Sequence, residues 1–549
     1  SVIDDKVRRI LRVKFLLGLF DEEVKNYKGA ANTKEHRQLV REVAEGGIVL
    51  LKNDNNVLPL NLKEIKSIAV IGPNASEARL GGGGSSQVGP PYSVSPLNAL
   101  KFRALKNKYG NKVTVNYTKG CNMPNDLNEI PSSAFRPSSS SKEHGLKAEY
   151  FNNANLTGSP VITRIDKSVN FDWGGISPGK GIGNDNFSAR WTGKLIPPKT
   201  GKYNLRLLSD DGSRLYLDNK LIVNSWWDHA PEAHEVVMDL VEGKEYDVRI
   251  EFYEKGGGAL MKFGWIAPGS TMIQEAVEAA KKSDAAVVFV GLNNLIEGEG
   301  VDRENMLLPE GQDKLIEAVN AVNKNTIVVL VNGTPVNMEK WVEKVPSIME
   351  VWYPGQEGGN AIVNILFGDV NPSGKLSVTF PKNLKDNPSY GNYPGGGGKV
   401  YYKEGIFVGY RHYDKNNIEP QFPFGHGLSY SEFEYSNLVV NPEQTEDGEV
   451  SVQVDIKNVS GREGKEVVQL YVTDEQSSLE RPPKELKAFK KVSLKPGEKK
   501  TVRLKLDKSS LSFYDQGKKK WVAEPGDFEV LIGSSSRDIR LKDSFTLTD

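Results

Sequence analysis

Apolar and polar positions follow two different patterns along the chain, and the patterns separate its parts. In the first pattern, continuous apolar runs alternate with segments of helical spacing, which is typical of a mostly parallel sheet covered by helices on both faces. The predicted strands lie in 67–73, 113–121, 285–293, 326–336, 347–355 and 375–381. The predicted helices occupy 1–20, 34–53, 272–282, 312–322 and 358–368. We expect an αβα sandwich.

The second pattern interrupts the first from about residue 122 to residue 270. After a Ser-rich stretch at 131–145, polar and apolar residues alternate, as expected for strands with one buried face. These strands are predicted in 146–151, 187–198, 201–222, 233–240, 244–254 and 259–266. An antiparallel β-domain is therefore predicted inside the α/β domain.

Polar and apolar residues alternate again in the last part of the chain. A Gly- and Tyr-rich segment after residue 381 is interpreted as a long ordered linker, and 431–549 contains seven or so short strands with regular turns. This pattern favours an immunoglobulin-like sandwich. The predicted fold class is thus multidomain, α/β plus all-β, with a β-sandwich inserted in the αβα sandwich and another at the end.

Composition narrows the class of protein. Lys and Arg total 71 and Asp and Glu total 71, so charge gives no case for a nucleic acid or membrane partner. The single Cys permits no intrachain disulfide and leaves the redox compartment open. No apolar run is long enough for a membrane span. The chain opens with Ser1 and an amphipathic helix that has nothing before it to pack on, so we expect its N-terminus to be a cut.

Several long motifs then resemble one known family. They are HRQLVREVAEGGIVLLKN, IAVIGP, GGGGSSQVGPPYSVSPLNAL, EGEGVDRENMLLP, VNGTPV, YPGQEGGNAIVNILFGDVNPSGKLSVTFP and FPFGHGLSYSEFEYSNL, in that order along the chain. Together they resemble the C-terminal portion of glycoside hydrolase family 3, of the β-glucosidase type. The stretch 187–222 resembles a protective-antigen-type β-sandwich, and the tail resembles a fibronectin type III-like domain.

The resemblance implies a division of the chain into parts. The expected parts are 1–33, a terminal helix and linker after a missing (β/α)₈ barrel; 34–142 and 270–395, the two pieces of the αβα sandwich; 143–269, the inserted β-sandwich; 396–430, a linker; and 431–549, the fibronectin type III-like domain. In the family the barrel carries an Asp nucleophile and most of the groups that hold the sugar. This chain lacks that barrel, so we expect it to be nearly inactive alone.

The resemblance also assigns chemistry to one acidic loop. Retaining glycoside hydrolysis needs two carboxyl groups roughly 5–5.5 Å apart. In the family the general acid/base lies in a Glu-Gly-x-Asp-Arg pattern, which here begins at Glu299. Glu299 is therefore the expected acid/base, and Glu297 is the runner-up. Asp302 and Arg303 are expected to pair and to support the loop. From composition alone, four acids on a loop would be a solvated cluster.

Two other motifs imitate catalytic signals. Asp172 precedes a Trp, as the barrel nucleophile does, but it lies in the predicted β-insert and is interpreted as a sandwich residue near a turn. The Gly-rich stretch 81–88 follows a predicted strand, but it lacks the spacing of a phosphate or dinucleotide fingerprint. No organic cofactor is predicted, and by resemblance this loop faces the barrel.

The insert offers candidate binding residues. Trp226 and Trp227 could stack on an outer sugar, although core packing is the alternative for one of them. Asp210 and Asp211 form a hairpin turn, with a Ca²⁺ site as the less favoured interpretation. The His residues are scattered, and His229 and His234, five apart on a loop, have no zinc-like partner set, so no metal site is predicted.

The predicted function is the C-terminal part of a retaining, exo-acting β-glucosidase that acts on non-reducing-end glucosyl residues. Its partners would be a β-linked oligosaccharide or glucoside and a barrel, in the same or a second chain. The alternatives are a non-catalytic carbohydrate-binding or scaffold protein and a β-xylosidase or other family 3 glycosidase. A periplasmic or secreted location is favoured.

Overall fold

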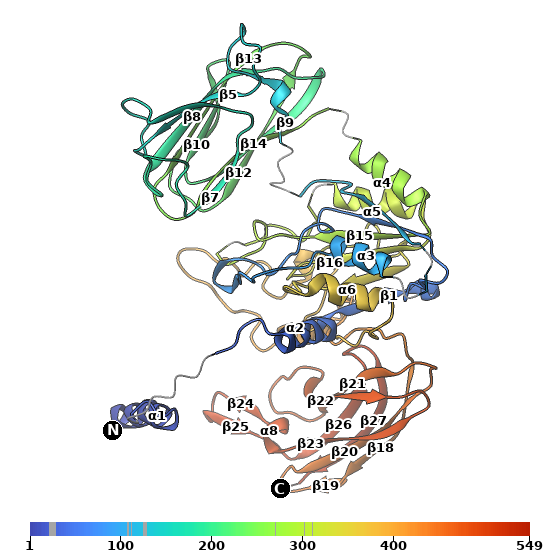
Figure 1. Cartoon of the computed structure of the whole chain (residues 1–549). Helices are drawn as coiled ribbons and strands as arrows, with labels where there is room; N and C mark the ends of the chain where they lie inside the picture. Colours follow the sequence, from blue (N-terminus) through green and yellow to red (C-terminus); the bar gives the residue numbers. More distant parts are fainter. Residues whose placement is uncertain are drawn as a thin grey trace.

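The computed structural model describes residues 1–20, 29–106, 109–110, 112–123, 129–268, 271–300, 302–309 and 311–548. An α/β sandwich lies in the middle of the view, with the β-insert above it and the C-terminal β-domain below (Figure 1). Helix α1 (Val2–Leu16) lies apart from them and has no buried residue. Among the described residues, no helix has both the length and the apolar composition that a membrane crossing requires.

The central sheet is parallel except at one edge. Its order is β1-β17-β16-β15-β2-β3, and β1 pairs antiparallel with β17. The strands are β1 (Val49–Asn53), β2 (Ser67–Ile71), β3 (Thr114–Thr118), β15 (Ala285–Gly291), β16 (Thr326–Val331) and β17 (Ser347–Glu350). Every residue of β15 and β16 is buried. The predicted, mostly parallel sheet is therefore confirmed.

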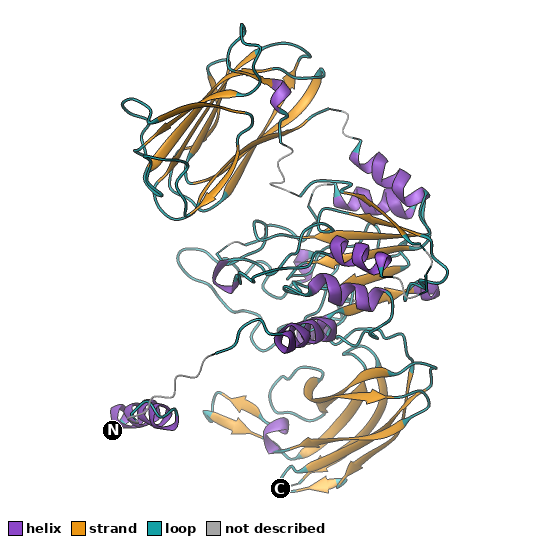
Figure 2. Cartoon of the chain, viewed as in Figure 1, coloured by secondary structure: helices purple, strands orange, loops and turns teal. Residues whose placement is uncertain are grey.

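Helices cover both faces of this sheet (Figure 2). Successive strand residues point to opposite faces, so Val287 and Val288 join different apolar clusters. The Val288 cluster includes residues of α4 (Met272–Lys281) and α5 (Gln312–Asn320). The Val287 cluster includes residues of the helices on the other face, which are α3 (Pro96–Leu105) and α6 (Gly358–Leu366).

Three local predictions need correction. Residues 34–53 form helix α2 (Lys34–Gly47) followed by β1, because the two glycines at 46–47 favour helix termination and the next apolar residues pair with β17. Residues 375–381 form no strand; Phe380 makes only an isolated bridge with Phe422, since β1 already occupies the sheet edge beside β17. Helix α3, which Ser95 caps and Pro96 begins, was not predicted.

The insert is an antiparallel β-sandwich, as predicted. One sheet contains β4 (Phe135–Arg136), β5 (Leu146–Phe151), β6 (Ile162–Asp166), β8 (Phe187–Leu195), β10 (Ser213–Leu217), β11 (Lys220–Ser225) and β13 (Tyr246–Glu254). The other contains β7 (Asn170–Gly174), β9 (Gly201–Asp210), β12 (Glu232–Leu240) and β14 (Ala259–Ile266). Fully buried Trp191 lies in the core between them. The predicted boundary at residue 269 lies outside the described residues.

The C-terminal domain is a second β-sandwich with its own core. Its sheets contain β18 (Phe433–Asn441), β20 (Val450–Asn458) and β23 (Lys499–Leu506) on one side, and β19 (Gln444–Thr445), β21 (Gly464–Asp474), β22 (Glu485–Leu494), β26 (Gly526–Gly533) and β27 (Ile539–Leu547) on the other. A hairpin of β24 (Phe513–Asp515) and β25 (Lys520–Val522) follows α8 (Lys508–Leu511). Helix α7 (Tyr410–Lys415) lies in the linker. Short 3₁₀ turns are η1 (Asp54–Asn56), η2 (Gly84–Ser86), η3 (Ser132–Ala134) and η4 (Leu384–Asp386).

Candidate active site

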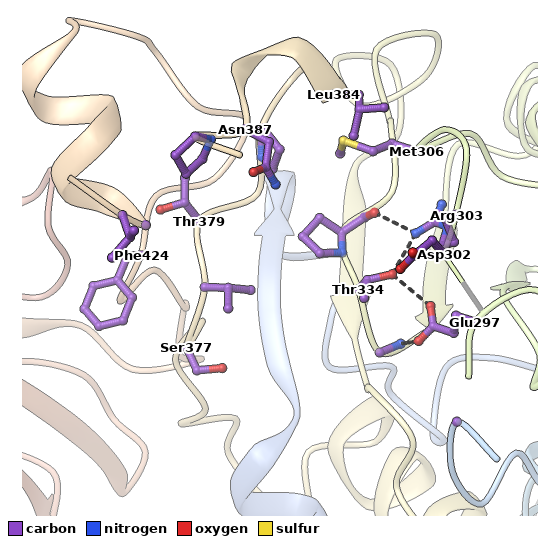
Figure 3. A pocket seen from close by; sticks show the side chains of 18 of the residues that line it. Glu297, Asp302, Arg303, Met306, Thr334, Ser377, Thr379, Leu384, Asn387 and Phe424 are labelled. Atoms are coloured by element: carbon purple, nitrogen blue, oxygen red, sulfur yellow. Dashed lines mark hydrogen bonds between the residues drawn. The ribbon is translucent and has the colours of Figure 1, made fainter. Parts of the chain in front are cut away.

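A large pocket opens at the carboxyl ends of β15 and β16, where open α/β sheets place their ligands. Its volume is about 1120 Å³. Its wall combines the acidic loop after β15, the loop after β16 and the Gly-rich loop around η2 with segments near residues 377–388 and 408–413 (Figure 3). The tertiary fold thus brings several of the sequence motifs to one cavity.

Glu297 is a buried carboxylate in the wall of this pocket. Its side chain is 7% exposed. Oε1 accepts a hydrogen bond from the Gly333 N–H at 2.6 Å, and Oε2 accepts one from the Thr334 hydroxyl at 2.9 Å. A Cβ at Gly333 would collide with this carboxylate. Glu297 therefore joins the loop after β15 to the loop after β16 (Figure 3).

Arg303 extends this network. Its Nη1 donates to Thr334 Oγ1 at 2.7 Å and to the Pro335 carbonyl at 3.1 Å. Burial lowers the pKa of the Arg303 guanidinium, and the charge of Glu297 opposes that effect. The Thr334 hydroxyl therefore connects the two opposite charges, since it accepts a hydrogen bond from Arg303 and donates one to Glu297.

Replacing Glu297 by Ala is expected to destabilise the α/β domain by about 2–4 kcal/mol, because the Gly333 N–H loses its acceptor and the half-buried Arg303 guanidinium loses a nearby opposite charge. Glu304→Ala is the matched control, since Glu304 is exposed on the same loop and should change stability by less than about 0.5 kcal/mol. Chemical denaturation of each variant measures the difference. Equal midpoints would contradict the assigned role of Glu297.

Glu299 differs from Glu297 in exposure and partners. It is exposed at the pocket, and its Oε2 accepts a hydrogen bond from the Ser85 N–H at 2.5 Å. The amide and hydroxyl of Ser85 lower the pKa of Glu299. A side chain at Gly84, which has φ of +62°, would collide with the Glu299 side chain. The glycine run at 81–84 thus allows a close approach to the acidic loop.

Asp302 and Arg303 do not form the expected pair. Asp302 Oδ2 accepts a hydrogen bond from the Tyr393 hydroxyl at 2.9 Å, whereas Arg303 faces Thr334 and Pro335. Adjacent side chains on an irregular loop point in different directions, so each finds a separate partner among the described residues. Val301, within the motif, lies outside the described residues.

Glu350 is a second buried carboxyl group that the sequence analysis did not select. It is fully buried at the end of β17, and its oxygens accept hydrogen bonds from Asn332 Nδ2 at 2.9 Å and the Trp352 N–H at 2.8 Å. Burial raises its pKa well above the ordinary value for Glu. Its position in an apolar strand gave no signal of this contact. It holds the strand ends that carry the pocket loops.

The two tryptophans of the insert have unequal surroundings. Trp226 is half-buried, with Tyr253 at 4.8 Å and the Arg214 guanidinium at 4.1 Å from its ring centre. Trp227 is 50% exposed. Neither lines the pocket described above, as far as the described residues show. Trp226 therefore packs against Tyr253 and Arg214, and Trp227 is the more exposed of the two rings.

The other sequence candidates in the insert have structural partners. Asp172 lies on β7, whose residues pair with β14. Asp211 accepts hydrogen bonds from the His229 N–H at 3.1 Å and the Lys255 N–H at 2.9 Å. These contacts agree with a structural turn. In the linker, the His426 ring lies 2.9 Å from the Leu51 carbonyl through Nε2.

Glu254 makes the insert sensitive to pH. It is fully buried, and burial together with the charges of Asp211 and Asp210 raises its pKa to about 8. Burial and Asp211 raise the pKa of Asp210 to about 6. The native state thus binds more protons than the unfolded state above pH of about 4.3, so stability falls as pH rises towards 8.

Glu254→Gln is therefore expected to stabilise the insert at pH 8 by roughly 2–4 kcal/mol and to change little at pH 4. Hydrogen exchange of the β13 amides at both pH values measures the effect. Asp172→Asn is the control, because Asp172 is an exposed acid on β7. The explanation fails if Glu254→Gln gives the same protection as the unchanged chain at pH 8.

The mostly parallel sheet with a pocket at its carboxyl edge, flanked by β-sandwiches, defines a multidomain α/β protein whose pocket lies where such sheets place their ligands. Residues 48–430 match the Glycosyl hydrolase family 3 C-terminal domain, and residues 466–536 match the Fibronectin type III-like domain. The chain belongs to glycosyl hydrolase family 3. These matches confirm the predicted α/β domain and the fibronectin type III-like domain that follows it.

Relatives extend over nearly the whole chain. A beta-glucosidase of Rhizobium radiobacter is 37% identical over 562 residues, covering 98% of this chain and 66% of the relative. The crystal structure of a beta-glucosidase from Kluyveromyces marxianus in complex with glucose has a TM-score of 0.74 and 35% identity, covering 100% of this chain and 67% of that one. DesR, a beta-glucosidase from Streptomyces venezuelae solved with D-glucose, has a TM-score of 0.73 and 32% identity, covering 98% and 63%. The chain thus spans about two thirds of the length of these relatives.

Proposed function

We propose that this chain is the part of a retaining, exo-acting β-glucosidase that supplies the general acid/base, Glu299. A (β/α)₈ barrel, in the same polypeptide or in a second one, supplies the Asp nucleophile. The observation that carries the proposal is the contrast between two neighbouring acids. Glu299 is exposed at the pocket and accepts a hydrogen bond from the Ser85 N–H through one oxygen, whereas Glu297 is buried with both oxygens bonded.

The acid/base role requires Glu299 to hold and then release a proton. It donates the proton to the oxygen of the leaving group while the nucleophile attacks the anomeric carbon. It then removes a proton from the water that hydrolyses the glycosyl-enzyme intermediate. In this chain the Ser85 contacts lower the pKa of Glu299. A nucleophile carboxylate brought close would raise that pKa towards the range a proton donor needs.

The remaining acids of the pocket support a nucleophile from elsewhere. Among the described residues that line the pocket, the acids are Glu297, Glu299 and Asp302. Glu297 is occupied by Gly333 and Thr334, and Asp302 accepts from Tyr393. Neither is placed as a free second carboxylate, which retention requires at roughly 5–5.5 Å from the acid/base.

Exposed apolar side chains support a large partner surface. On α2, Leu39 and Val43 are 57% and 67% exposed. On α1 the exposed apolar residues are Val2, Ile3, Val7, Ile10, Leu11, Val13, Phe15 and Leu16. Exposed apolar patches of this kind mark interaction sites in soluble proteins. The barrel is the partner that the proposal assigns to these helices.

A β-glucoside is proposed over the β-xyloside alternative because the relatives above carry the name beta-glucosidase. The test isolates the native species that contains this chain from its source. The isolated species should have the mass of the chain plus a barrel, hydrolyse an aryl β-D-glucoside and release the β-anomer first. A species of this chain's mass alone that binds sugar without hydrolysing it would instead establish a carbohydrate-binding protein.

A further inference from the structure

The insert carries a group of possible metal ligands away from the pocket. His229 lies on the loop between β11 and β12, and Glu232 and His234 lie at the start of β12. One nitrogen of each imidazole and one carboxylate oxygen all lie within 4.8 Å of one another. Glu232 Oε2 is 3.9 Å from His229 Nδ1 and 3.7 Å from His234 Nε2. The sequence pattern predicted no metal site, because the spacing of His229 and His234 gives no sign that Glu232 is a third ligand.

The strand geometry explains why these side chains converge. Residues two apart on a strand share a face, so Glu232 and His234 lie on the face that carries Val236 and Met238. Val236 and Met238 pack against the core of the sandwich. At the start of β12 the same face carries the Glu232 carboxylate and the His234 imidazole in place of apolar side chains. The preceding loop then folds His229 back towards them.

His234 gives an independent sign of a missing ligand. Its Nε2 is buried and has no hydrogen-bond partner among the described residues. A buried polar atom without a partner is costly, and native structures usually satisfy it with protein, water or an ion. Glu232 Oε2, at 3.7 Å, is too far for a hydrogen bond but suits an ion placed between the two atoms.

His229 can join such a site after a change of tautomer. Its Nε2 lies 2.9 Å from Ser225 Oγ, and its Nδ1 lies 2.7 Å from the Ala230 carbonyl. Beside the Ala230 carbonyl, Nδ1 carries the proton and donates, so Nε2 accepts from the Ser225 hydroxyl. Metal binding moves the proton to Nε2, which then donates to Ser225, and a ring rotation turns the freed Nδ1 lone pair towards Glu232. A metal-bound His is commonly held by a hydrogen bond from its other nitrogen in this way. The Asp211 carboxylate fixes the His229 backbone N–H at 3.1 Å.

We infer that His229, Glu232 and His234 bind one divalent transition-metal ion, with Zn²⁺ as the fitting ion. Two imidazoles and a carboxylate form a ligand set that Zn²⁺ accepts, and half-exposed Glu232 leaves a fourth position for water. Metal–ligand bonds of about 2.0–2.2 Å in a tetrahedron put ligand atoms roughly 3.3–3.5 Å apart. The two Glu232 distances must therefore close by about 0.2–0.6 Å, and the separation of the two imidazole nitrogens, which is within 4.8 Å, by at most about 1.5 Å. The ion joins the β11–β12 loop, with exposed Trp227, to the edge of the sandwich.

The test titrates Zn²⁺ into the full, tag-free chain after EDTA treatment and dialysis, using isothermal calorimetry. We expect one saturable equivalent of micromolar affinity or tighter. Trp227 lies with its ring centre 5.9 Å from that of His229 and 6.3 Å from that of His234, so its fluorescence should change in the same titration. Trp227→Phe should remove the fluorescence change and keep the calorimetric one.

Variants separate this site from other surface histidines. Glu232→Gln keeps the shape of a 46% exposed side chain and should weaken Zn²⁺ binding at least about tenfold. His234→Ala should abolish the saturable phase. His144→Ala, an exposed histidine of the same insert, should leave it unchanged. The inference is overturned if the unchanged chain shows no saturable phase, or if Glu232→Gln and His234→Ala bind as tightly as the unchanged chain.

Discussion

Replacing Glu299 by Ala in the proposed complete enzyme, this chain together with a barrel, is expected to lower turnover of an unactivated β-glucoside by about 10²–10⁴-fold. The loss arises because no group protonates the leaving oxygen or activates the water. With a dinitrophenyl glucoside, the dinitrophenolate leaves without protonation, so the rate of forming the glycosyl-enzyme intermediate should change little. Hydrolysis of that intermediate should remain slow. Added azide needs no general base, and it should restore turnover and give a β-glucosyl azide. Steady-state kinetics and product analysis measure these effects.

Glu304→Ala is the matched control for that experiment. Glu304 lies five residues further along the same acidic loop and is exposed. Its removal should leave turnover of both substrates within about twofold. Glu297→Ala should reduce stability as well as activity, which separates a loop-supporting carboxylate from a proton donor. An azide-rescued Glu297→Ala with a normal denaturation midpoint would transfer the acid/base role from Glu299 to Glu297.

The chain by itself is expected to hydrolyse an aryl β-D-glucoside at least about 10⁵-fold more slowly than the complete enzyme. Retention requires an attacking carboxylate, and the acids of this pocket other than Glu299 have structural partners. A discontinuous assay over hours, with a cooperative unfolding transition as evidence of a folded chain, makes the comparison. The Glu299→Ala chain is the control and should have the same background rate.

Turnover by the isolated chain above that background would place a nucleophile within it, and Asp302 would then be the first residue to replace. Addition of the separately purified barrel should restore turnover if the two parts associate through α1 and α2. The exposed apolar residues of these helices predict that contact. Polar replacement of Leu39 and Val43 should weaken the restoration without unfolding the α/β domain, because both side chains are exposed.

The periodicity of the chain predicted most of the fold because the buried strands leave a direct trace. Strands β15 and β16 are continuous apolar runs, as a sheet covered on both faces demands. Local pattern could not distinguish a strand from the extension of a helix at 49–53, where pairing with β17 decides the conformation. It also predicted a strand at 375–381, where the sheet edge is already occupied.

The sequence by itself determined the acidic motif that contains Glu297 and Glu299, because a run of residue types is a local property. Only the tertiary structure separated their surroundings, since the loop after β16 brings the Gly333 N–H to Glu297 and η2 brings the Ser85 N–H to Glu299. The group of His229, Glu232 and His234 likewise needs a folded loop against a strand edge. Burial and hydrogen bonding depend on segments far apart in the chain, and for that reason no local pattern contains them.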